Sequence, residues 1–494
     1  MCSLNQVNCW KLLNNKTISR KVKNKSSEAI HLTFINLNDN IVQSSSRVDV
    51  NTKIIYLCLC TDITLFSFIQ VSGIKNKMRF NSFSSKTSET INLKKLDSEF
   101  LFWFSGFTDG EGNFLIYLDR SYIKLRFRIN LHKDDIKVIE TIKSRLNIGR
   151  IVSDTDTSCS YIIEDSLGLE LLCNIFKNFP LHTSKNLDFE SFFEAYLIRK
   201  KGKLSESDIN KILFLKNNMN SKRTVFSYNT SKSQIIINPN WFIGFLEGEG
   251  TFGIKTGSSL YFQVAQKTTS QECLTGIINY LHDLSNNTKL PENSKISPLH
   301  VTSTTNTKTN VVSIVIANID SLYYFLLPLL DNSNMYSRKK IDFELWRMAL
   351  LLKIHGYYFS IEGKILFLDI SDILNKRYSD KNSLDVETII NDITNRFELI
   401  MKKDPLFDVN LYVPHIENVR KFSKINKSEN PKVVYIYTEN GLIEGSPFSS
   451  FSLAHKALGL KSSSNTCNRY IDTNRRYKNK YIFSSKPVDS ASKD

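Results

Sequence analysis

Residues 104–112 read Phe-Ser-Gly-Phe-Thr-Asp-Gly-Glu-Gly, and residues 242–250 read Phe-Ile-Gly-Phe-Leu-Glu-Gly-Glu-Gly. A Trp precedes each copy, and alternating apolar residues follow it. Further along, residues 184–190 (Ser-Lys-Asn-Leu-Asp-Phe-Glu) match residues 338–344 (Arg-Lys-Lys-Ile-Asp-Phe-Glu). Because two landmarks recur in the same order, the sequence predicts that this part of the chain is an internal duplication.

Each copy has the same predicted order of elements. The motif is expected to form a helix that ends at its last Gly, and strands are expected next. Residues 122–131 alternate strictly between apolar and polar side chains, whereas residues 260–267 alternate less cleanly. Two further helices are expected in each copy, near Asp134 and over 188–198, and near Ser270 and over 342–352. The repeated unit is therefore predicted to be α-β-β-α-β-β-α, which places the chain in the α+β class.

Glycines recur on one face of each predicted motif helix. Gly106 and Gly110 are four residues apart, and so are Gly244 and Gly248. Residues with this spacing lie on the same side of a helix. Without Cβ atoms, two such faces can approach backbone to backbone, so we expect these four residues to form the interface between the two motif helices.

That interface would bring one carboxylate from each copy together. Glu111 and Glu249 occupy the same motif position, at the last turn of each helix. Two adjacent carboxylates repel each other unless a cation neutralises them. A divalent metal does so, and paired metals of this kind serve phosphodiester hydrolysis. The alternative is a pair of ordinary amphipathic helices with acids in solvent, but the shared register in two copies argues against it.

The charge balance favours a polyanionic partner. The 494 residues include 65 Lys and Arg against 49 Asp and Glu, a net charge of +16. Such an excess attracts phosphates at long range, although a basic protein that binds no nucleic acid is the alternative. The eight cysteines are scattered without a zinc-site or disulfide pattern. The abundance of Lys, Asn, Ile, Ser and Phe, which have A/T-rich codons, suggests an A/T-rich organellar genome.

The two motifs resemble the signature helices of the LAGLIDADG homing endonucleases, in the single-chain class with two motifs. The resemblance extends over about residues 97–352, and Leu131–Asp135 and Phe262–Lys267 also resemble the sequences that follow the family's strands. The chain departs from the family at Ser105, Thr108 and Ile243. Both expected metal ligands are Glu, where Asp is common in the family.

The resemblance implies two pseudo-symmetric αββαββα repeats that form a saddle, with antiparallel sheets along the major groove of double-stranded DNA. Glu111 and Glu249 would bind Mg²⁺ (or Mn²⁺) and activate water, and the carbonyls of Gly110 and Gly248 would add ligands. The protein would be a monomer with an internal pseudo-dimer that cuts both DNA strands at an intron insertion site. A mitochondrial group I intron is the expected origin.

Several polar residues on the predicted strands are candidates for DNA contacts. In the first copy the candidates form the polar face of residues 122–131: Lys124, Arg126, Arg128 and Asn130. The second copy offers fewer, Gln263 and Lys267. The alternative is a solvated sheet face. Gln266 has the opposite parity and is not expected on that face. Lys185 and Lys339 are repeated basic residues that fit either an active site or a solvated helix start.

Residues 431–487 are expected to form a separate DNA-binding module. Val433–Tyr437 and Leu442–Ile443 flank a predicted hairpin turn at residues 439–441. Ser452–Leu458 and Ser463–Tyr470 are expected to form a helix-turn-helix. This module resembles the nuclease-associated modular domains found beside homing endonucleases. Its basic residues are candidates for DNA contacts: Arg469, Arg475 and Arg476, with Lys461 and Lys478 nearby.

The predicted division of the chain has seven parts, and two other functions stay open. The parts are a poorly ordered extension (1–95), the first repeat (96–202), a linker (203–237), the second repeat (238–356), a connecting region (357–430), the module (431–487) and a tail (488–494). One alternative function is a maturase that binds its own intron RNA, and the other is a transcription regulator. Retention of both acids favours the nuclease. No membrane span is expected.

Overall fold

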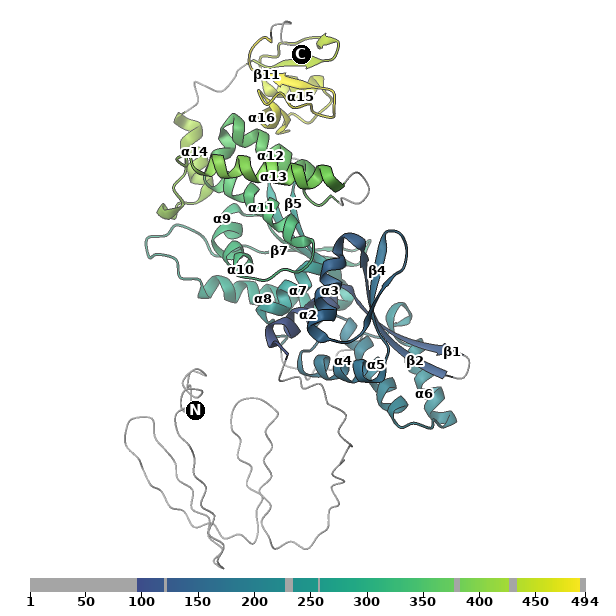
Figure 1. The fold of residues 1–494 in the computed structure, drawn as a ribbon. Helices are drawn as coiled ribbons and strands as arrows, with labels where there is room; N and C mark the ends of the chain where they lie inside the picture. Colours follow the sequence, from purple (N-terminus) through teal and green to yellow (C-terminus); the bar gives the residue numbers. More distant parts are fainter. Residues whose placement is uncertain are drawn as a thin grey trace, which may run out of the picture. The chain divides into compact units, whose positions relative to one another are not determined.

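A computed structural model describes residues 96–119, 122–226, 234–255, 258–376, 383–425 and 433–488 (Figure 1). The expected N-terminal extension, residues 1–95, lies outside the described residues, and so does most of the expected tail.

The first repeat begins with the motif helix and continues into a four-stranded antiparallel sheet. Helix α2 starts after Asp97, whose side chain caps it by accepting a hydrogen bond from the backbone N–H of Glu99 at 3.0 Å. The sheet has the strand order β1-β2-β4-β3. The elements are α2 (Ser98–Glu111), β1 (Gly112–Asp119), β2 (Tyr122–His132), α3 (Ile136–Leu146), β3 (Arg150–Ser153), β4 (Ser158–Ile163), α4 (Ser166–Asn178) and α5 (Lys185–Lys200).

The second repeat has the same topology. Helix α7 starts with Pro239 in its first turn, and the Asn238 side chain caps it. The strand order β5-β6-β8-β7 matches that of the first sheet. The elements are α7 (Pro239–Glu249), β5 (Gly250–Ile254), β6 (Leu260–Lys267), α8 (Gln271–Asn287), β7 (Thr302–Asn306), β8 (Val311–Ile316), a helical run of α9 (Ile319–Ser321), the π-helix η5 (Leu322–Leu326) and α10 (Leu327–Asp331), and α11 (Lys339–Ile354). The predicted α+β class with two pseudo-symmetric repeats is confirmed.

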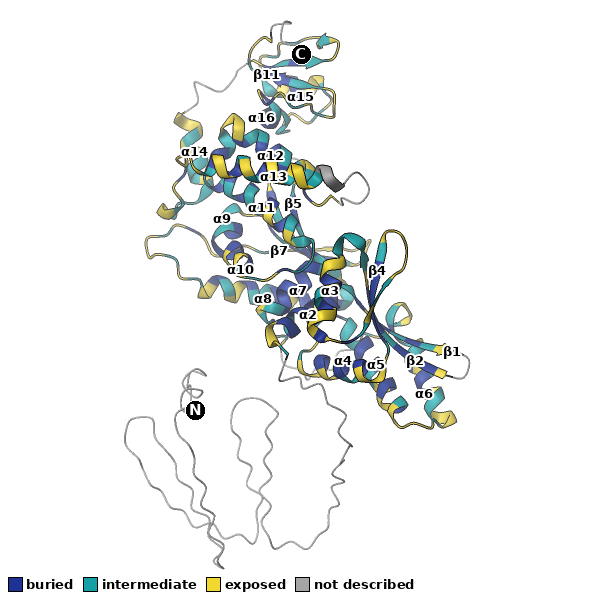
Figure 2. Cartoon of the chain, viewed as in Figure 1, coloured by how far each residue is buried: buried dark blue, intermediate teal, exposed yellow. Residues whose placement is uncertain are grey.

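One face of each sheet packs against helices. In β2 the side chains of Leu125, Phe127 and Ile129 are fully buried, whereas Lys124 and Asn130 are exposed. In β6 the buried residues Phe262 and Val264 alternate with partly exposed ones in the same way. Figure 2 shows the buried residues gathered where helices and sheets meet. The strict alternation of β2 therefore predicted both its secondary structure and its buried face.

The repeated unit is longer than the sequence pattern indicated. Helix α4 precedes α5, and a further helix follows the closing helix of each repeat: α6 (Glu206–Asn217) and α12 (Ile361–Ile373). After each of these stands an Asn with a left-handed backbone, Asn220 (φ 55°) and Asn375 (φ 61°). Their side-chain amides donate to the carbonyls of Phe114 and Phe252, at 2.8 and 2.6 Å. Residues 206–222 of the stretch expected to be a linker thus pack on the first repeat in the way that α12 packs on the second.

The connecting region and the C-terminal module complete the described chain. The described part of residues 357–430 is mainly helical, with α12, α13 (Ser383–Met401) and α14 (His415–Ile425). The module contains β9 (Tyr435–Thr438), β10 (Gly441–Leu442), α15 (Phe451–Ala457), α16 (Thr466–Tyr470) and β11 (Ile482–Ser484). Its hairpin and two helices lie close to where the sequence placed them, and β11 adds a third strand beside β9. The module has its own small core around Val434, Ile436 and Phe483.

Candidate active site at the paired motif helices

Helices α2 and α7 pack against each other through their glycines. A Cβ atom built on Gly106 would lie 1.9 Å from the carbonyl oxygen of Trp241, and one on Gly244 would lie 1.9 Å from that of Trp103. One turn later, a Cβ on Gly110 would lie 3.0 Å from the Cα of Gly248. No side chain larger than hydrogen fits between the two backbones at the first pair of positions. The structure therefore places all four sequence-predicted glycines in the contact between the helices.

This contact brings Glu111 and Glu249 together. The two residues end α2 and α7, and each lies over the last glycine of the other helix. A Cβ on Gly110 would be 3.6 Å from the Cγ of Glu249, and one on Gly248 would be 3.5 Å from the Cγ of Glu111. Both side chains are partly buried. The arrangement puts two carboxylates from different repeats into one partly desolvated place.

Glu249 has surroundings that favour its neutral form. Burial raises the pKa of Glu249 to about 6; Lys185 lowers it and the neighbouring Glu111 raises it. The amide nitrogen of Gln266 donates to Oε1 of Glu249 at 2.7 Å. The parity of β6 turns Gln266 away from the outer face of the sheet, and this orientation directs it toward the motif helix. The alternation of β6 excluded Gln266 from the predicted DNA contacts, and the same alternation could have predicted that its side chain faces the motif helix.

Two lysines that the sequence left undecided lie at the site. The Nζ of Lys185 donates to the carbonyl oxygens of Thr108 and Gly110, at 3.1 and 2.9 Å, beside the end of α2. The Nζ of Lys339 donates to the carbonyl oxygen of Gly250 at 2.7 Å, just past the end of α7. Burial lowers the pKa of both lysines, while nearby carboxylates raise it. The two lysines are therefore partly buried cations beside the paired acids and not solvated helix starts.

Each motif also contains a buried acid that bonds to the Trp of the other repeat. Trp103 Nε1 donates to Oε1 of Glu247 at 2.6 Å, and Trp241 Nε1 donates to Oδ2 of Asp109 at 3.1 Å. Burial raises the pKa of both acids. The two bonds cross the contact between α2 and α7 in opposite directions.

The same acids hold the chain just before the two lysines. Asp109 accepts from the backbone N–H groups of His182 and Thr183, at 2.7 and 3.0 Å. Glu247 accepts from the backbone N–H groups of Tyr336 and Ser337, its Oε2 at 3.0 and 2.5 Å. Because α5 and α11 begin at the lysines a few residues later, these bonds fix where the lysine side chains start. This arrangement was not predicted from the sequence, because Asp109 and Glu247 were treated there only as members of the repeated motif.

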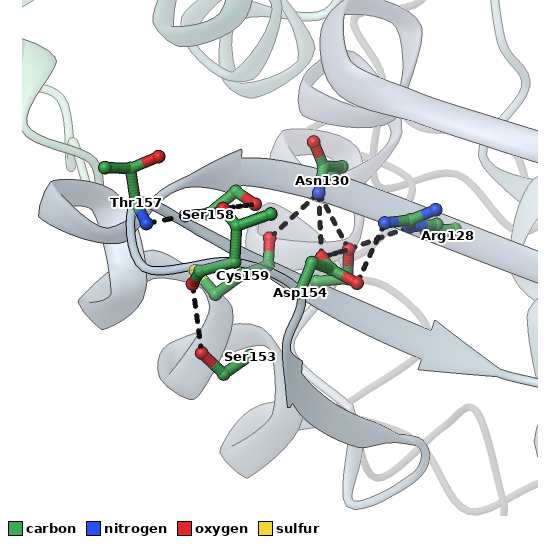
Figure 3. Close-up of polar contacts among 9 residues, drawn as sticks. Arg128, Asn130, Ser153, Asp154, Thr157, Ser158 and Cys159 are labelled. Atoms are coloured by element: carbon green, nitrogen blue, oxygen red, sulfur yellow. Dashed lines mark hydrogen bonds and ion pairs between the residues drawn. The ribbon is translucent and has the colours of Figure 1, made fainter.

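Three of the predicted DNA contacts of the first repeat, Arg126, Arg128 and Asn130, belong to two polar clusters on the outer face of its sheet. Glu164 accepts from Arg126 Nε at 2.8 Å and from Arg150 Nη2 at 2.6 Å. Figure 3 shows Asp154 between Arg128 and Asn130: it pairs with Arg128 Nη2 at 3.0 Å and accepts from Asn130 Nδ2 at 2.9 Å. In the second repeat, Gln263 donates to Ser313 Oγ at 3.4 Å, and Lys267 is exposed at the end of β6.

The arginines of the C-terminal module lie in intramolecular contacts. Arg469 is buried and donates to Ser371 Oγ of α12 at 2.9 Å. Arg475 forms ion pairs with Asp369 and Asp372 of the same helix. Arg476 pairs with Glu439 inside the module at 2.7 Å. The DNA contacts predicted for these three arginines would therefore compete with contacts that they already make in the protein, most of all for the buried Arg469.

The oxygen atoms at the ends of the paired helices are suitable ligands for a hard divalent cation. Within the described residues, no group of three or more His, Cys, Asp or Glu side chains is placed to hold a metal ion. Two carboxylates from different repeats remain, with the carbonyls of Gly110 and Gly248 close by. Oxygen ligands of this kind and a small number of protein ligands suit Mg²⁺, which usually keeps several waters.

The fold and the site together define an internally duplicated protein whose two halves share one helix pair and one pair of acids. The family model of LAGLIDADG endonucleases matches this chain twice, over residues 104–196 and 242–350. These segments hold the two motifs, both four-stranded sheets and most of the closing helices. The chain therefore belongs to the LAGLIDADG endonuclease family.

Several known proteins are similar to this chain. The "uncharacterized mitochondrial protein RF1" of Saccharomyces cerevisiae is 25% identical over 85% of this chain and 88% of its own length. The "probable intron-encoded endonuclease Cox1-I1b" of Schizosaccharomyces pombe is 25% identical over 70% of this chain and 90% of its own length. Among solved structures, the LAGLIDADG homing endonuclease I-GzeII in complex with its DNA target is 20% identical, covering 56% of this chain and 98% of that one, with a TM-score of 0.48.

Proposed function

We propose that this chain is a site-specific endonuclease that hydrolyses both strands of double-stranded DNA at an intron insertion site. One observation carries the proposal: Glu111 and Glu249 meet at the ends of two helices that only glycines allow to touch. Family membership supports the reaction class, and the net charge of +16 suits a phosphate backbone.

Glu111 and Glu249 would hold Mg²⁺ or Mn²⁺, with the carbonyls of Gly110 and Gly248 as further oxygen ligands. When bound, the cation supplies Lewis acidity and lowers the pKa of a coordinated water. The protein's own groups do the rest of the work. Lys185 and Lys339 place positive charge where negative charge grows on the phosphate during hydrolysis. Gln266 fixes the orientation of Glu249 through its 2.7 Å hydrogen bond.

The setting of the reaction is proposed from the relatives. The yeast relative is named as a mitochondrial protein, and the fission-yeast relative is named as an intron-encoded endonuclease. Together with the A/T-codon composition, these names support a mitochondrial, intron-encoded origin. No helix among the described residues is both long and apolar enough to cross a membrane.

A maturase that binds intron RNA is the alternative on the same fold. A protein that only assists splicing has no use for two precisely paired carboxylates. Both acids are present here, and the buried acids and lysines around them are also intact. These features favour the nuclease over a chain that acts on RNA alone.

The test is cleavage of a DNA duplex that spans the intronless insertion junction, in the presence of Mg²⁺. Glu111→Gln and Glu249→Gln should each lower the rate by at least roughly 100-fold, because each removes one charge from the shared site. Binding of the same duplex should change little. Glu140→Gln, at an exposed position of α3, is the matched control and should cut like the wild type. Unchanged cutting by either active-site variant would refute the assignment.

A further inference from the structure

The outer faces of the two sheets are chemically different, although the sheets share one topology. In the first sheet the described strands carry four Lys or Arg residues, all on the outer face: Lys124, Arg126, Arg128 and Arg150. In the second sheet, Lys267 is the single charged residue within the described strands β5 to β8. Hydroxyl, amide and small apolar side chains take the other places.

The strand register shows which side chains share the outer face of the second sheet. Gln263 stands opposite Val315, and Lys267 stands opposite Val311. In β7, Thr302, Thr304 and Asn306 pair with Val315, Ser313 and Val311. The hydrogen bond from Gln263 to Ser313 confirms that these rows face the same way. The face therefore offers two amides (Gln263 and Asn306), several hydroxyls, two Val side chains and one cation, Lys267.

The arginines of the first sheet are held in place by acids. Arg126 bonds Glu164 through both Nε and Nη2, at 2.8 and 2.7 Å, and Arg128 bonds Asp154 and Ser160. Hydrogen bonds keep these acids ionised. The bond from Ser160 contributes most to lowering the pKa of Asp154, and the bond from Arg150 contributes most to lowering the pKa of Glu164. Each acid offsets part of the positive charge. Such arginines attract phosphates weakly, but their guanidinium groups are held in a fixed orientation, which suits hydrogen bonding to a particular base.

Because different side chains recognise different base pairs, the two outer faces are expected to prefer different DNA sequences. In the major groove, Arg donates two hydrogen bonds to guanine O6 and N7, and carboxylates accept from cytosine N4. Gln and Asn pair with adenine in the same bidentate way, and apolar side chains and the Thr methyl group contact the methyl of thymine. On this basis the arginines and acids of the first sheet match G·C pairs, and the amides, hydroxyls and Val side chains of the second sheet match A·T pairs. The exceptions are Asn113 and Asn130 in the first sheet and Lys267 in the second.

We infer that the DNA target is divided, with G·C pairs recognised by the outer face of β1–β4 and A·T pairs recognised by the outer face of β5–β8. The inference rests on the proposed function and goes further by naming the composition of each half of the target. Because a fixed guanidinium loses about 1–3 kcal/mol at a wrong base pair, each arginine held by an acid should discriminate roughly 5- to 150-fold at one position.

The test is selection of duplexes from a random DNA library by the full-length Glu111→Gln/Glu249→Gln protein, which should bind without cutting. Sequencing should yield an asymmetric motif with G·C positions concentrated in one half and A·T positions in the other. Arg128→Ala should lower the preference at a G·C position roughly 5- to 150-fold and leave the A·T half unchanged. Gln263→Ala should do the reverse. Lys137→Gln, on the exposed side of α3, is the control for loss of charge.

The outcomes separate this inference from the proposed function. A selected motif in which both halves have similar composition would overturn the division while leaving the endonuclease proposal intact. So would an Arg128→Ala protein that loses selectivity in the A·T half. A library from which the protein selects no motif at all would overturn both, because a site-specific nuclease must prefer some sequence.

Discussion

The contact between the motif helices and the outer faces of the sheets differ in how closely the two repeats agree. At the helices the agreement is nearly complete: the built Cβ distances at Gly106 and Gly244 are both 1.9 Å, and those at Gly110 and Gly248 are both 3.0 Å. The sheets agree in strand order but not in the chemistry of their outer residues. One region preserves the duplication and the other has diverged.

The difference has a physical cause. At the helix contact each repeat is the packing partner of the other, so a change on one side must be met by the other side. Packed interiors tolerate added atoms poorly. Outer residues of the sheets meet no such partner, and they are free to differ according to what binds them. A duplicated protein can thus keep one symmetric site while it recognises an asymmetric ligand.

The largest effect is expected from breaking the symmetric contact. Gly244→Ala places a methyl group 1.9 Å from the carbonyl oxygen of Trp103, where the obstacle is backbone and cannot rotate away. We expect the free energy of unfolding to fall by at least about 3 kcal/mol, the upper part of the usual range for overpacking. Gly106→Ala should have the same effect, and urea unfolding of both variants measures it.

Gly110→Ala is the matched comparison within the same interface. Its Cβ would meet the Cα of Gly248 at 3.0 Å, a contact that a small shift of the helices can relieve. We expect a loss closer to about 1 kcal/mol. Equal stability of Gly244→Ala and the wild type would show that the helices do not touch here.

The sequence predicted this helix contact well because glycine spacing is a local signal. The positions of the glycines and of Glu111 and Glu249 are set by one helical turn each, and the strict alternation of β2 similarly determined its buried face. Duplication then supplied the long-range information, since two equal motifs are expected to meet at a pseudo-two-fold axis.

Other parts of the site depend on residues far apart in the chain, and sequence patterns did not predict them. The bond between Trp103 and Glu247 joins the two repeats, and nothing local to either residue indicates its partner. The role of Lys185 stayed undecided between an active site and a solvated helix start, because its contacts with Thr108 and Gly110 come from a distant element. The role of Asn220 was equally hidden, although its match with Asn375 could have been found by extending the repeat comparison.

The next effect is expected from the two crossed acids. Glu247→Gln replaces one of two acceptor oxygens with an NH2 group, so either the Trp103 indole or the backbone N–H groups of Tyr336 and Ser337 lose an acceptor. Buried donors without partners cost about 1–3 kcal/mol, so stability should fall by that amount. Asp109→Asn should cost a similar amount because it meets the equivalent donors of the first repeat.

Cleavage kinetics sharpen this prediction. Both variants should lower kcat more than they raise KM, because the acids set the start of the helices that carry Lys185 and Lys339. Trp103→Phe removes one donor to Glu247 and should cause a smaller loss of stability than Glu247→Gln. Variants that lose stability but keep kcat would limit the acids to a structural role.

A smaller effect should appear in the dependence of metal binding on pH. Burial raises the pKa of Glu249 from an ordinary value of 4.5 to about 6. In the metal-free protein, protonated Glu249 therefore contributes to the free energy of unfolding at pH values below its pKa in the unfolded chain. This contribution is lost as the pH rises through about 6, the pKa of Glu249 in the folded protein. Mg²⁺ binds the ionised form, so its affinity should fall by up to roughly tenfold for each pH unit below that value.

Titration calorimetry with Mg²⁺ at several pH values measures this dependence. The Glu249→Gln protein provides the control, because it has no carboxyl at this position to titrate. An affinity for Mg²⁺ that stays constant from neutral pH to well below the pKa would contradict the placement of the cation at Glu249.

The smallest effect is expected at the C-terminal module, where the contact has no counterpart in the duplication. Arg475 pairs with Asp369 and Asp372 of α12; its side chain is 34% exposed, that of Asp369 13% and that of Asp372 53%. Partly exposed ion pairs contribute at most about 1 kcal/mol, and salt weakens them further. Arg475→Gln should thus weaken docking on α12 by less than that amount without unfolding the module, which has its own core.

Hydrogen exchange of the α12 backbone measures this loss, and a double-mutant cycle with Asp369→Asn identifies its source. Asp369→Asn also breaks the ion pair between Asp369 and Arg396. If the Arg475 pair accounts for the docking, the double variant should therefore exchange little faster than Asp369→Asn alone, because that variant has already lost the contact with Arg475. Arg476→Gln, whose partner Glu439 lies inside the module, should leave exchange in α12 unchanged. Additive effects of Arg475→Gln and Asp369→Asn would show that the residues act separately. Arg475 would then be available to DNA, as the sequence alone predicted, and its loss should weaken binding to all duplexes about equally.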